Sequence, residues 1–170
     1  MSIETSKFTW GHININVSNL ERSIEFYEKL GFEVFIPAIP YLDLKSEAVM
    51  QVVPEAATRA LGLHPDTRGR ACIMQLDNGF PKIDLTELAG KTQQTPLTNS
   101  DLGLVRICLA SQDLQKDYAY LREQEVEFIL EPQPCKDGMA EIATCFDPDG
   151  TLIELIQVYL EKWPNPAVSR

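Results

Sequence analysis

The sequence lacks the features that mark membrane, secreted or nucleic-acid-binding proteins. No apolar run approaches the roughly 18 residues of a membrane-spanning helix, and the first five residues lack the basic start and apolar stretch of a secretion signal. The four cysteines show no CxxC spacing, which argues against a disulfide framework or zinc knuckle. Basic residues are scarce, and the formal charge of −10 would repel a phosphate backbone. We therefore expect a cytoplasmic protein that binds neither membranes nor nucleic acids.

What the sequence does contain is an internal repeat. Residues 12–20 align with residues 106–114 at an offset of 94 positions (106 − 12), and both segments alternate apolar and polar residues as a half-buried strand does. Each segment ends on a helix-start signal, Ser18 and Asn19 in the first copy and Asp113 in the second. Hydrophobic residues make up 44% of the 170, enough for one packed domain.

An amphipathic helix is predicted after each opening strand. The residues of the two apolar stripes are Leu20, Ile24 and Tyr27 in the first copy, and Leu114, Tyr118 and Leu121 in the second. Each helix should lead into a short strand, at 32–35 and 126–129. Closing strands at 82–86 and 152–156 match at an offset of 70 (154 − 84), so the first copy carries about 24 extra residues (94 − 70). Turn signals, Asn78-Gly79 and Asp147 to Gly150, stand just before these strands.

The repeat predicts an α+β fold of two tandem βαβββ modules, with a curved mixed sheet around a cavity and the helices on its outer face. One domain, 1–170, would comprise module 1 at about 8–90, module 2 at about 101–158 and a C-terminal tail at 159–170. The extra length forms an insert at 36–70. Within it, the segment from Pro54 to Gly62 predicts a short helix. The insert is either a lid or rim over the site or an elaborated surface loop.

The period of two also assigns strand residues to two faces. One face is apolar and should lie under the helices; it comprises Ile13, Ile15, Val17, Ile83, Leu85, Val105, Ile107, Leu109, Ile153 and Leu155. The other mixes ionisable and apolar groups; it comprises Trp10, His12, Asn14, Asn16, Lys82, Asp84, Thr86, Leu104, Arg106, Cys108, Ala110, Leu152, Glu154 and Ile156. Because buried charges are costly unless they pair or bind an ion, the mixed face indicates a site.

Two stretches resemble a known family. GHININVSNLERSIEFYEKLGF (11–32) looks like the first strand and helix of the vicinal oxygen chelate superfamily, and FDPDGTLIEL (146–155) like its closing hairpin. This superfamily includes glyoxalases, bleomycin-resistance proteins and extradiol dioxygenases, and the similarity runs through roughly 8–35 and 70–158. The resemblance is specific for the fold but not for the reaction, because the fold hosts many chemistries. It also implies a homodimer.

The resemblance implies four site positions. In the family's metal enzymes each opening and each closing strand supplies one ligand, and the matching residues here are His12, Asp84, Arg106 and Glu154. Three of them, His12, Asp84 and Glu154, suit a divalent ion such as Mn, Fe, Co, Ni or Zn. Arg106 departs from the pattern, because a guanidinium cannot coordinate a cation. Either Arg106 turns away to hold an anionic substrate, or it forms a metal-free ion-pair network with the two carboxylates, which we favour.

Two other possible ligands are set aside at this stage. Glu87 lies three residues beyond Asp84, so its side chain should point to the opposite face, and we interpret it as structural or exposed. His64 lies in the insert and is interpreted as a surface residue.

The site residues predict a small-molecule lyase or isomerase of the glyoxalase-like type. Asp84 or Glu154 would move a proton next to a carbonyl, and His12 would stabilise the developing oxyanion. The residues expected to contact the substrate are Trp10, Asn14 and Cys108. The alternative is a non-catalytic small-molecule binding protein like the bleomycin-resistance proteins, with a cationic or amphipathic ligand stacked on Trp10. An extradiol dioxygenase is the least favoured, because Arg106 replaces its second histidine.

Overall fold

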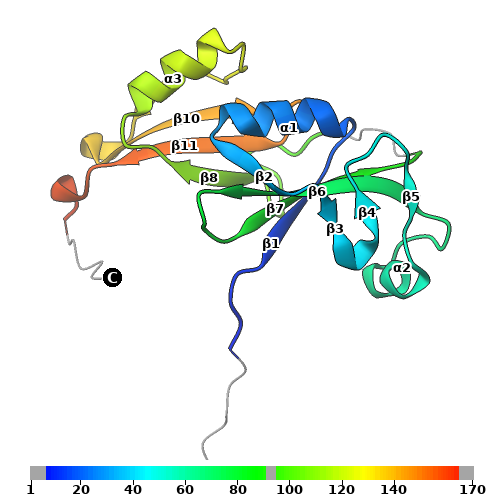
Figure 1. Ribbon diagram of the computed structural model, residues 1–170. Helices are drawn as coiled ribbons and strands as arrows, with labels where there is room; N and C mark the ends of the chain where they lie inside the picture. Colours follow the sequence, from blue (N-terminus) through cyan, green and yellow to red (C-terminus); the bar gives the residue numbers. More distant parts are fainter. Residues whose placement is uncertain (1–6, 91–94, 165–170) are drawn as a thin grey trace, which may run out of the picture. The chain divides into compact units, whose positions relative to one another are not determined.

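The computed structural model describes residues 7–90 and 95–164 (Figure 1). The chain divides into two compact units, Met1–Thr92 and Gln93–Arg170. Each unit combines helices with its own open mixed sheet, so the predicted α+β class is confirmed. Among the described residues, no helix has the length and apolar character needed to span a membrane.

Unit 1 contains a βαβββ core with an insertion. The core elements are β1 (His12–Asn16), α1 (Leu20–Lys29), β2 (Phe32–Ile36), β6 (Arg68–Leu76) and β7 (Lys82–Leu88). The strand order is β1-β7-β6-β2, with β1 parallel to β7, and β6 antiparallel to β7 and to β2. The inserted elements are β3 (Ala38–Ile39), η1 (Pro40–Leu42), β4 (Leu44–Lys45), β5 (Gln51–Val52) and α2 (Glu55–Leu61). The first strand of the unit, β1, is therefore hydrogen-bonded directly to its last strand, β7.

Unit 2 repeats this plan without the insertion. Its elements are β8 (Arg106–Ala110), α3 (Leu114–Glu123), β9 (Gln133–Pro134), η2 (Lys136–Gly138), β10 (Ala140–Phe146), β11 (Leu152–Val158) and η3 (Leu160–Lys162). The strand order is β8-β11-β10-β9, and β8 is parallel to β11. The strand predicted at 126–129 is reduced to a single bridge between Phe128 and Cys145, because only a few backbone groups there reach β10. Of the predicted tail, residues 165–170 lie outside the described residues.

The two units share their hydrogen-bond register residue by residue. Asn14 lies opposite Asp84 in unit 1, and Cys108 lies opposite Glu154 in unit 2, as the two sequence offsets require. The equivalence extends to the start of each helix. The backbone N–H of Leu20 donates to Glu87 over 2.8 Å, and that of Leu114 donates to Gln157 over 2.9 Å. The internal repeat is therefore a structural one.

Local signals position the helices and turns as predicted. Asn19 Oδ1 accepts the backbone N–H of Arg22 at 2.9 Å, and Asp113 Oδ1 accepts that of Lys116 at 3.1 Å, which satisfies a donor at the start of each helix. Before β11, Asp147 Oδ1 accepts the backbone N–H groups of Asp149, within the predicted turn, and of Thr151, the residue that follows it. The turn fixes where the closing strand begins.

The insert is a packed substructure. Ile39, Leu44 and Val53 of the insert form a buried cluster with Ala71 of β6. The predicted helix is present as α2 and ends at Gly62, whose φ of +64° places it in the left-handed region that favours glycine. The cluster attaches the β3–η1–β4 hairpin to the sheet and so fixes the position of the short η1 helix at its tip.

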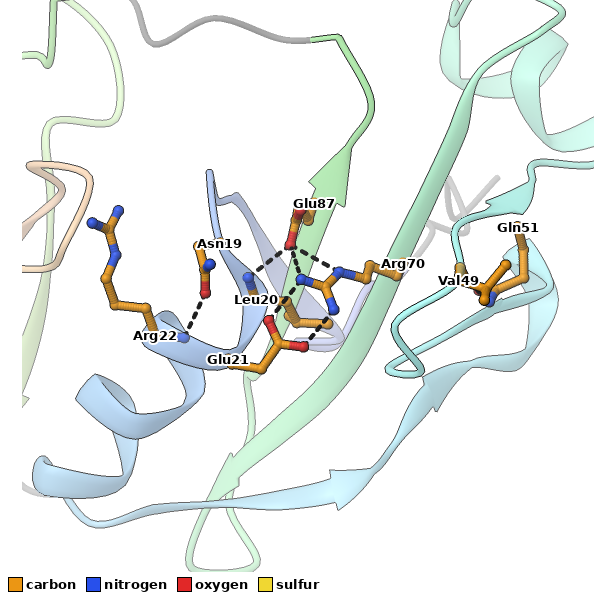
Figure 2. Close-up of polar contacts among 8 residues, drawn as sticks. All are labelled: Asn19, Leu20, Glu21, Arg22, Val49, Gln51, Arg70 and Glu87. Carbon is orange, nitrogen blue, oxygen red and sulfur yellow. Dashed lines mark hydrogen bonds and ion pairs between the residues drawn. The ribbon is translucent and has the colours of Figure 1, made fainter.

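A buried arginine connects helix α1 to the sheet of unit 1 (Figure 2). Arg70 of β6 forms ion pairs with Glu21 of α1 and with Glu87 of β7; its Nη2 lies 2.8 Å from Glu87 Oε2. The same Glu87 oxygen also accepts the Leu20 N–H. Glu87 therefore points to the helix side of the sheet, and its predicted structural role is confirmed.

Candidate functional site

Asp84 is the centre of a polar cluster on the face of β7 away from helix α1. Its side chain is 2% exposed. Oδ2 accepts a hydrogen bond of 2.9 Å from the Tyr41 hydroxyl and lies 3.5 Å from Nε2 of His12. Oδ1 is buried and has no hydrogen-bond partner among the described residues. Since buried polar atoms are nearly always paired, an unpaired Oδ1 distinguishes this carboxylate from an ordinary buried one.

The environment of Asp84 changes its acidity. Burial raises the pKa of Asp84, while the hydrogen bond from Tyr41 and the proximity of His12 act in the opposite direction. A carboxyl group with a raised pKa is a better proton acceptor than an ordinary aspartate, because its conjugate acid is weaker. The cluster therefore combines a buried base with two aromatic neighbours.

Tyr41 is the site residue that sequence reasoning missed. It lies in η1, at the tip of the insert hairpin, and its ring stacks on that of His12 with centroids 6.3 Å apart. Burial, followed by the hydrogen bond to Asp84, raises the pKa of Tyr41 to about 12. The phenol therefore stays protonated at neutral pH and donates to the carboxylate. Asp84 is buried, whereas Tyr41 is 60% exposed and the His12 side chain is 46% exposed, so two of the three residues of the cluster face solvent.

Of the other residues of unit 1 considered in the sequence, Asn14 adjoins the cluster, whereas Trp10 and His64 are exposed. Asn14 is paired in register with Asp84, and its Oδ1 accepts a hydrogen bond of 2.8 Å from Thr86. Trp10 precedes β1 and is 73% exposed. His64 is largely exposed and lies beside Asp66, as a surface residue should. Asn14 is thus the predicted substrate contact that adjoins Asp84.

Unit 2 holds the other half of the predicted set. Arg106 Nε forms an ion pair with Glu154 Oε2, and its Nη1 donates to Asn99 over 3.1 Å. The second Glu154 oxygen, Oε1, accepts from the Cys108 thiol at 3.6 Å. Burial and the neighbouring Glu154 carboxylate raise the pKa of Cys108 to about 11, so the thiol remains protonated. Both oxygens of Glu154 are therefore engaged.

The residues do not fit a complete metal centre in either unit. Among the described residues, no group of three or more His, Cys, Asp or Glu side chains is arranged to hold a metal. Unit 1 offers His12 and Asp84, while in unit 2 Glu154 is neutralised by Arg106. Protein metal sites of this class use three or four ligands. The predicted ion-pair network joined Arg106 to both Asp84 and Glu154. The structure shows the ion pair with Glu154, and the contacts of Asp84 are with Tyr41 and His12.

Comparisons with solved structures place this fold. A glyoxalase family protein from Bacillus cereus superposes with a TM-score of 0.71 at 17% identity, covering 93% of this chain and 99% of that one. Glyoxalase I from Leishmania major, described as trypanothione-dependent, gives a TM-score of 0.56 at 23% identity, covering 89% and 87%. Glyoxalase I from Zea mays gives 0.57 at 20% identity, covering 86% of this chain but 43% of the maize chain. The TM-scores show a shared fold, and at these identities the fold alone is shown.

The family itself is shown by a match to most of the chain. No curated protein matches the sequence. The family model named Glyoxalase/Bleomycin resistance protein/Dioxygenase superfamily matches residues 9–155, which include β1, β7 and β8 and the first half of β11. The chain belongs to the glyoxalase/bleomycin resistance protein/dioxygenase superfamily.

Proposed function

We propose that this protein is a lyase or isomerase that transfers a proton next to a carbonyl group of a small molecule. The observation that carries the proposal is the arrangement of Asp84, whose carboxylate is buried, bonded through Oδ2 to Tyr41 and free at Oδ1. A general base needs a raised pKa and an unoccupied oxygen, and Asp84 has both.

Each residue of the cluster has a role in this proposal. Asp84 Oδ1 takes the proton from the carbon beside the carbonyl; the electron pair of that C–H bond forms a C=C bond with the carbonyl carbon, and the π pair of the carbonyl moves onto its oxygen. His12, half-exposed beside the carboxylate, donates a hydrogen bond to the developing oxyanion. Tyr41 holds Oδ2, so that Oδ1 is the oxygen presented to the substrate. Return of the proton to a neighbouring atom completes an isomerisation; departure of a group from that atom completes a lyase reaction.

The direct test is isotope exchange. Protein without added metal is incubated in D2O with small carbonyl compounds, including 2-oxo acids, and NMR follows deuterium at the carbon beside the carbonyl. We expect exchange above the buffer rate with at least one compound. A small molecule that copurifies with the protein and is released unchanged, with no exchange in any compound, would favour a binding protein instead.

We also propose that the reaction proceeds without a divalent metal. The support is the ion pair between Arg106 and Glu154, which places a fixed positive charge on one of the predicted metal ligands. A guanidinium supplies no lone pair to a cation and competes for the carboxylate.

Arg106→His is expected to create metal affinity, because it frees Glu154 and adds an imidazole. Stabilisation by Mn or Ni should rise by more than about 1 kcal/mol, measured as the thermal shift with metal against chelator. Arg59→His, at an exposed position near the end of α2, is the matched control. Equal stabilisation of the Arg106 variant and the native protein would mean that the ion pair with Arg106 is not what keeps Glu154 from binding a metal.

Tyr41→Phe is expected to slow isotope exchange about tenfold, because the carboxylate of Asp84 loses the hydrogen bond that fixes its orientation, and one hydrogen bond to a charged group is worth about that factor. Because the Tyr41 hydroxyl lowers the pKa of Asp84, its removal should also move the acidic limb of the pH–rate profile to higher pH. Tyr120→Phe, at an exposed tyrosine of α3, is the control. A slower variant with an unshifted profile would contradict the assigned hydrogen bond.

A further inference from the structure

Lys82 is a buried cation at the start of β7. The residue is 7% exposed, and its Nζ donates a hydrogen bond of 2.8 Å to Gln75 Oε1. The ammonium also lies over two phenyl rings, 4.8 Å from the centroid of Phe35 and 4.6 Å from that of Phe80. The ammonium has three N–H donors, and the Gln75 amide uses one of them.

The charge of Lys82 lacks a direct counter-ion. None of the ion pairs between described residues involves it. The carboxylate connected to it is Glu33, which is exposed and reaches the ammonium only through the Gln75 amide. Two rings and one neutral amide compensate a buried charge incompletely, since buried charges are normally paired or bind an ion. An anion is the kind of partner that would complete the compensation of this charge.

Lys82 shares a sheet face with the Asp84 cluster. It precedes Asp84 by two residues on the same strand, which places their α-carbons about 6.6 Å apart on one face. It is also the register partner of His12 on β1. An anionic group at Lys82 and a carbonyl group at His12 and Asp84 could therefore belong to one small molecule.

We propose that Lys82, Phe35 and Phe80 form a subsite for the carboxylate of a small 2-oxo acid with an apolar side chain. The proposal rests on the function assigned above and names its substrate class. The carboxylate takes the N–H donors that Gln75 leaves free, and the apolar part lies on the two rings, which are 49% and 65% exposed. The 2-oxo group, one carbon away, then faces the proton-transfer residues.

The test is Lys82→Met, which keeps the length of the side chain and removes its charge. Isothermal titration compares 4-methyl-2-oxopentanoate with 4-methyl-2-pentanone, a ketone without the carboxylate, and with inorganic phosphate. The native protein should prefer the oxo acid over both. Lys82→Met should weaken oxo-acid binding at least tenfold and leave ketone binding unchanged. Lys162→Met, which removes an ammonium 4.6 Å from the ring centroid of Tyr159, is the matched control and should bind the oxo acid as the native protein does.

Folding of the variant is checked by its thermal midpoint. Because the substitution removes a buried unpaired charge, the midpoint should equal or exceed the native value. Unchanged oxo-acid affinity in folded Lys82→Met would overturn the subsite, and so would phosphate binding as tight as that of the oxo acid.

Failure of the subsite and failure of the proposed function give different results. If Lys82→Met keeps its oxo-acid affinity while the native protein exchanges protons, the subsite is wrong and the proton-transfer function stands. If Lys82→Met loses that affinity while the native protein exchanges no protons with any compound, the subsite stands and the function is wrong.

Discussion

Replacing Asp84 with asparagine is expected to slow isotope exchange by a factor of about 100 to 10,000, the usual contribution of a general base. The amide has nearly the shape of the carboxylate but cannot accept the proton. The rate of deuterium incorporation, measured by NMR in the variant and the native protein, gives the effect.

The same variant is also expected to change the stability of the folded protein. Because burial raises the pKa of Asp84 above its value in the unfolded chain, the folded state binds the proton more tightly, and ionisation destabilises the fold as the pH rises through the window between the two values. Asp84→Asn should therefore be at least as stable as the native protein at neutral pH.

The control for Asp84 is Asp66→Asn, since the Asp66 side chain is 93% exposed. It should exchange at the native rate. A loss of less than about threefold in folded Asp84→Asn, well short of what a general base contributes, would assign the base to another residue.

Arg70→Met is expected to destabilise unit 1 by about 3 kcal/mol, because it leaves the Glu87 carboxylate buried without its cation. Glu87 would keep the Leu20 N–H as a partner, which offsets only part of the cost of the buried charge. Urea unfolding, with the slope of the transition compared between variant and native protein, measures the change in the free energy of unfolding.

Glu21→Gln removes the exposed partner of the same arginine and should cost less than about 1 kcal/mol. The pKa of Glu21 is lowered, chiefly by its hydrogen bond to Arg70, so this contribution is present above the unfolded pKa and is lost as the pH falls through the folded pKa. Equal losses in the two variants would show that burial of Glu87 does not set the cost of removing Arg70.

The features that could be predicted from the sequence are those with a period or a local cap. The two offsets of the internal repeat placed His12, Asp84, Arg106 and Glu154 on equivalent positions of two strand pairs, and the observed register agrees. Asn19 and Asp113 marked the helix starts because a side-chain oxygen three residues before a backbone N–H is a local arrangement.

The features that could not be predicted depend on contacts between distant segments. The hydrogen bond between Tyr41 and Asp84 joins residues 43 positions apart and requires the insert hairpin to pack on β6 through a cluster with no periodic pattern. The ion pairs of Arg70 likewise join three elements. The short strand predicted at 126–129 was wrong for a related reason. A segment at the edge of a sheet forms a strand only where its backbone lies alongside the neighbouring strand, and here that contact is one bridge between Phe128 and Cys145.

The parallel pairing of the first and last strands of each unit has a consequence for how the chain folds. β1 cannot find its neighbour until β7 has been synthesised, 70 residues after it (82 − 12), whereas β8 waits only 46 residues for β11 (152 − 106). The entropic cost of closing a loop grows only with the logarithm of its length, so closing the 70-residue loop costs only about 0.4 kcal/mol more than closing the 46-residue loop. A hairpin can therefore be inserted between the first and last strands of such a unit at almost no cost in loop-closure entropy. In unit 1 the inserted hairpin carries the tyrosine that contacts Asp84.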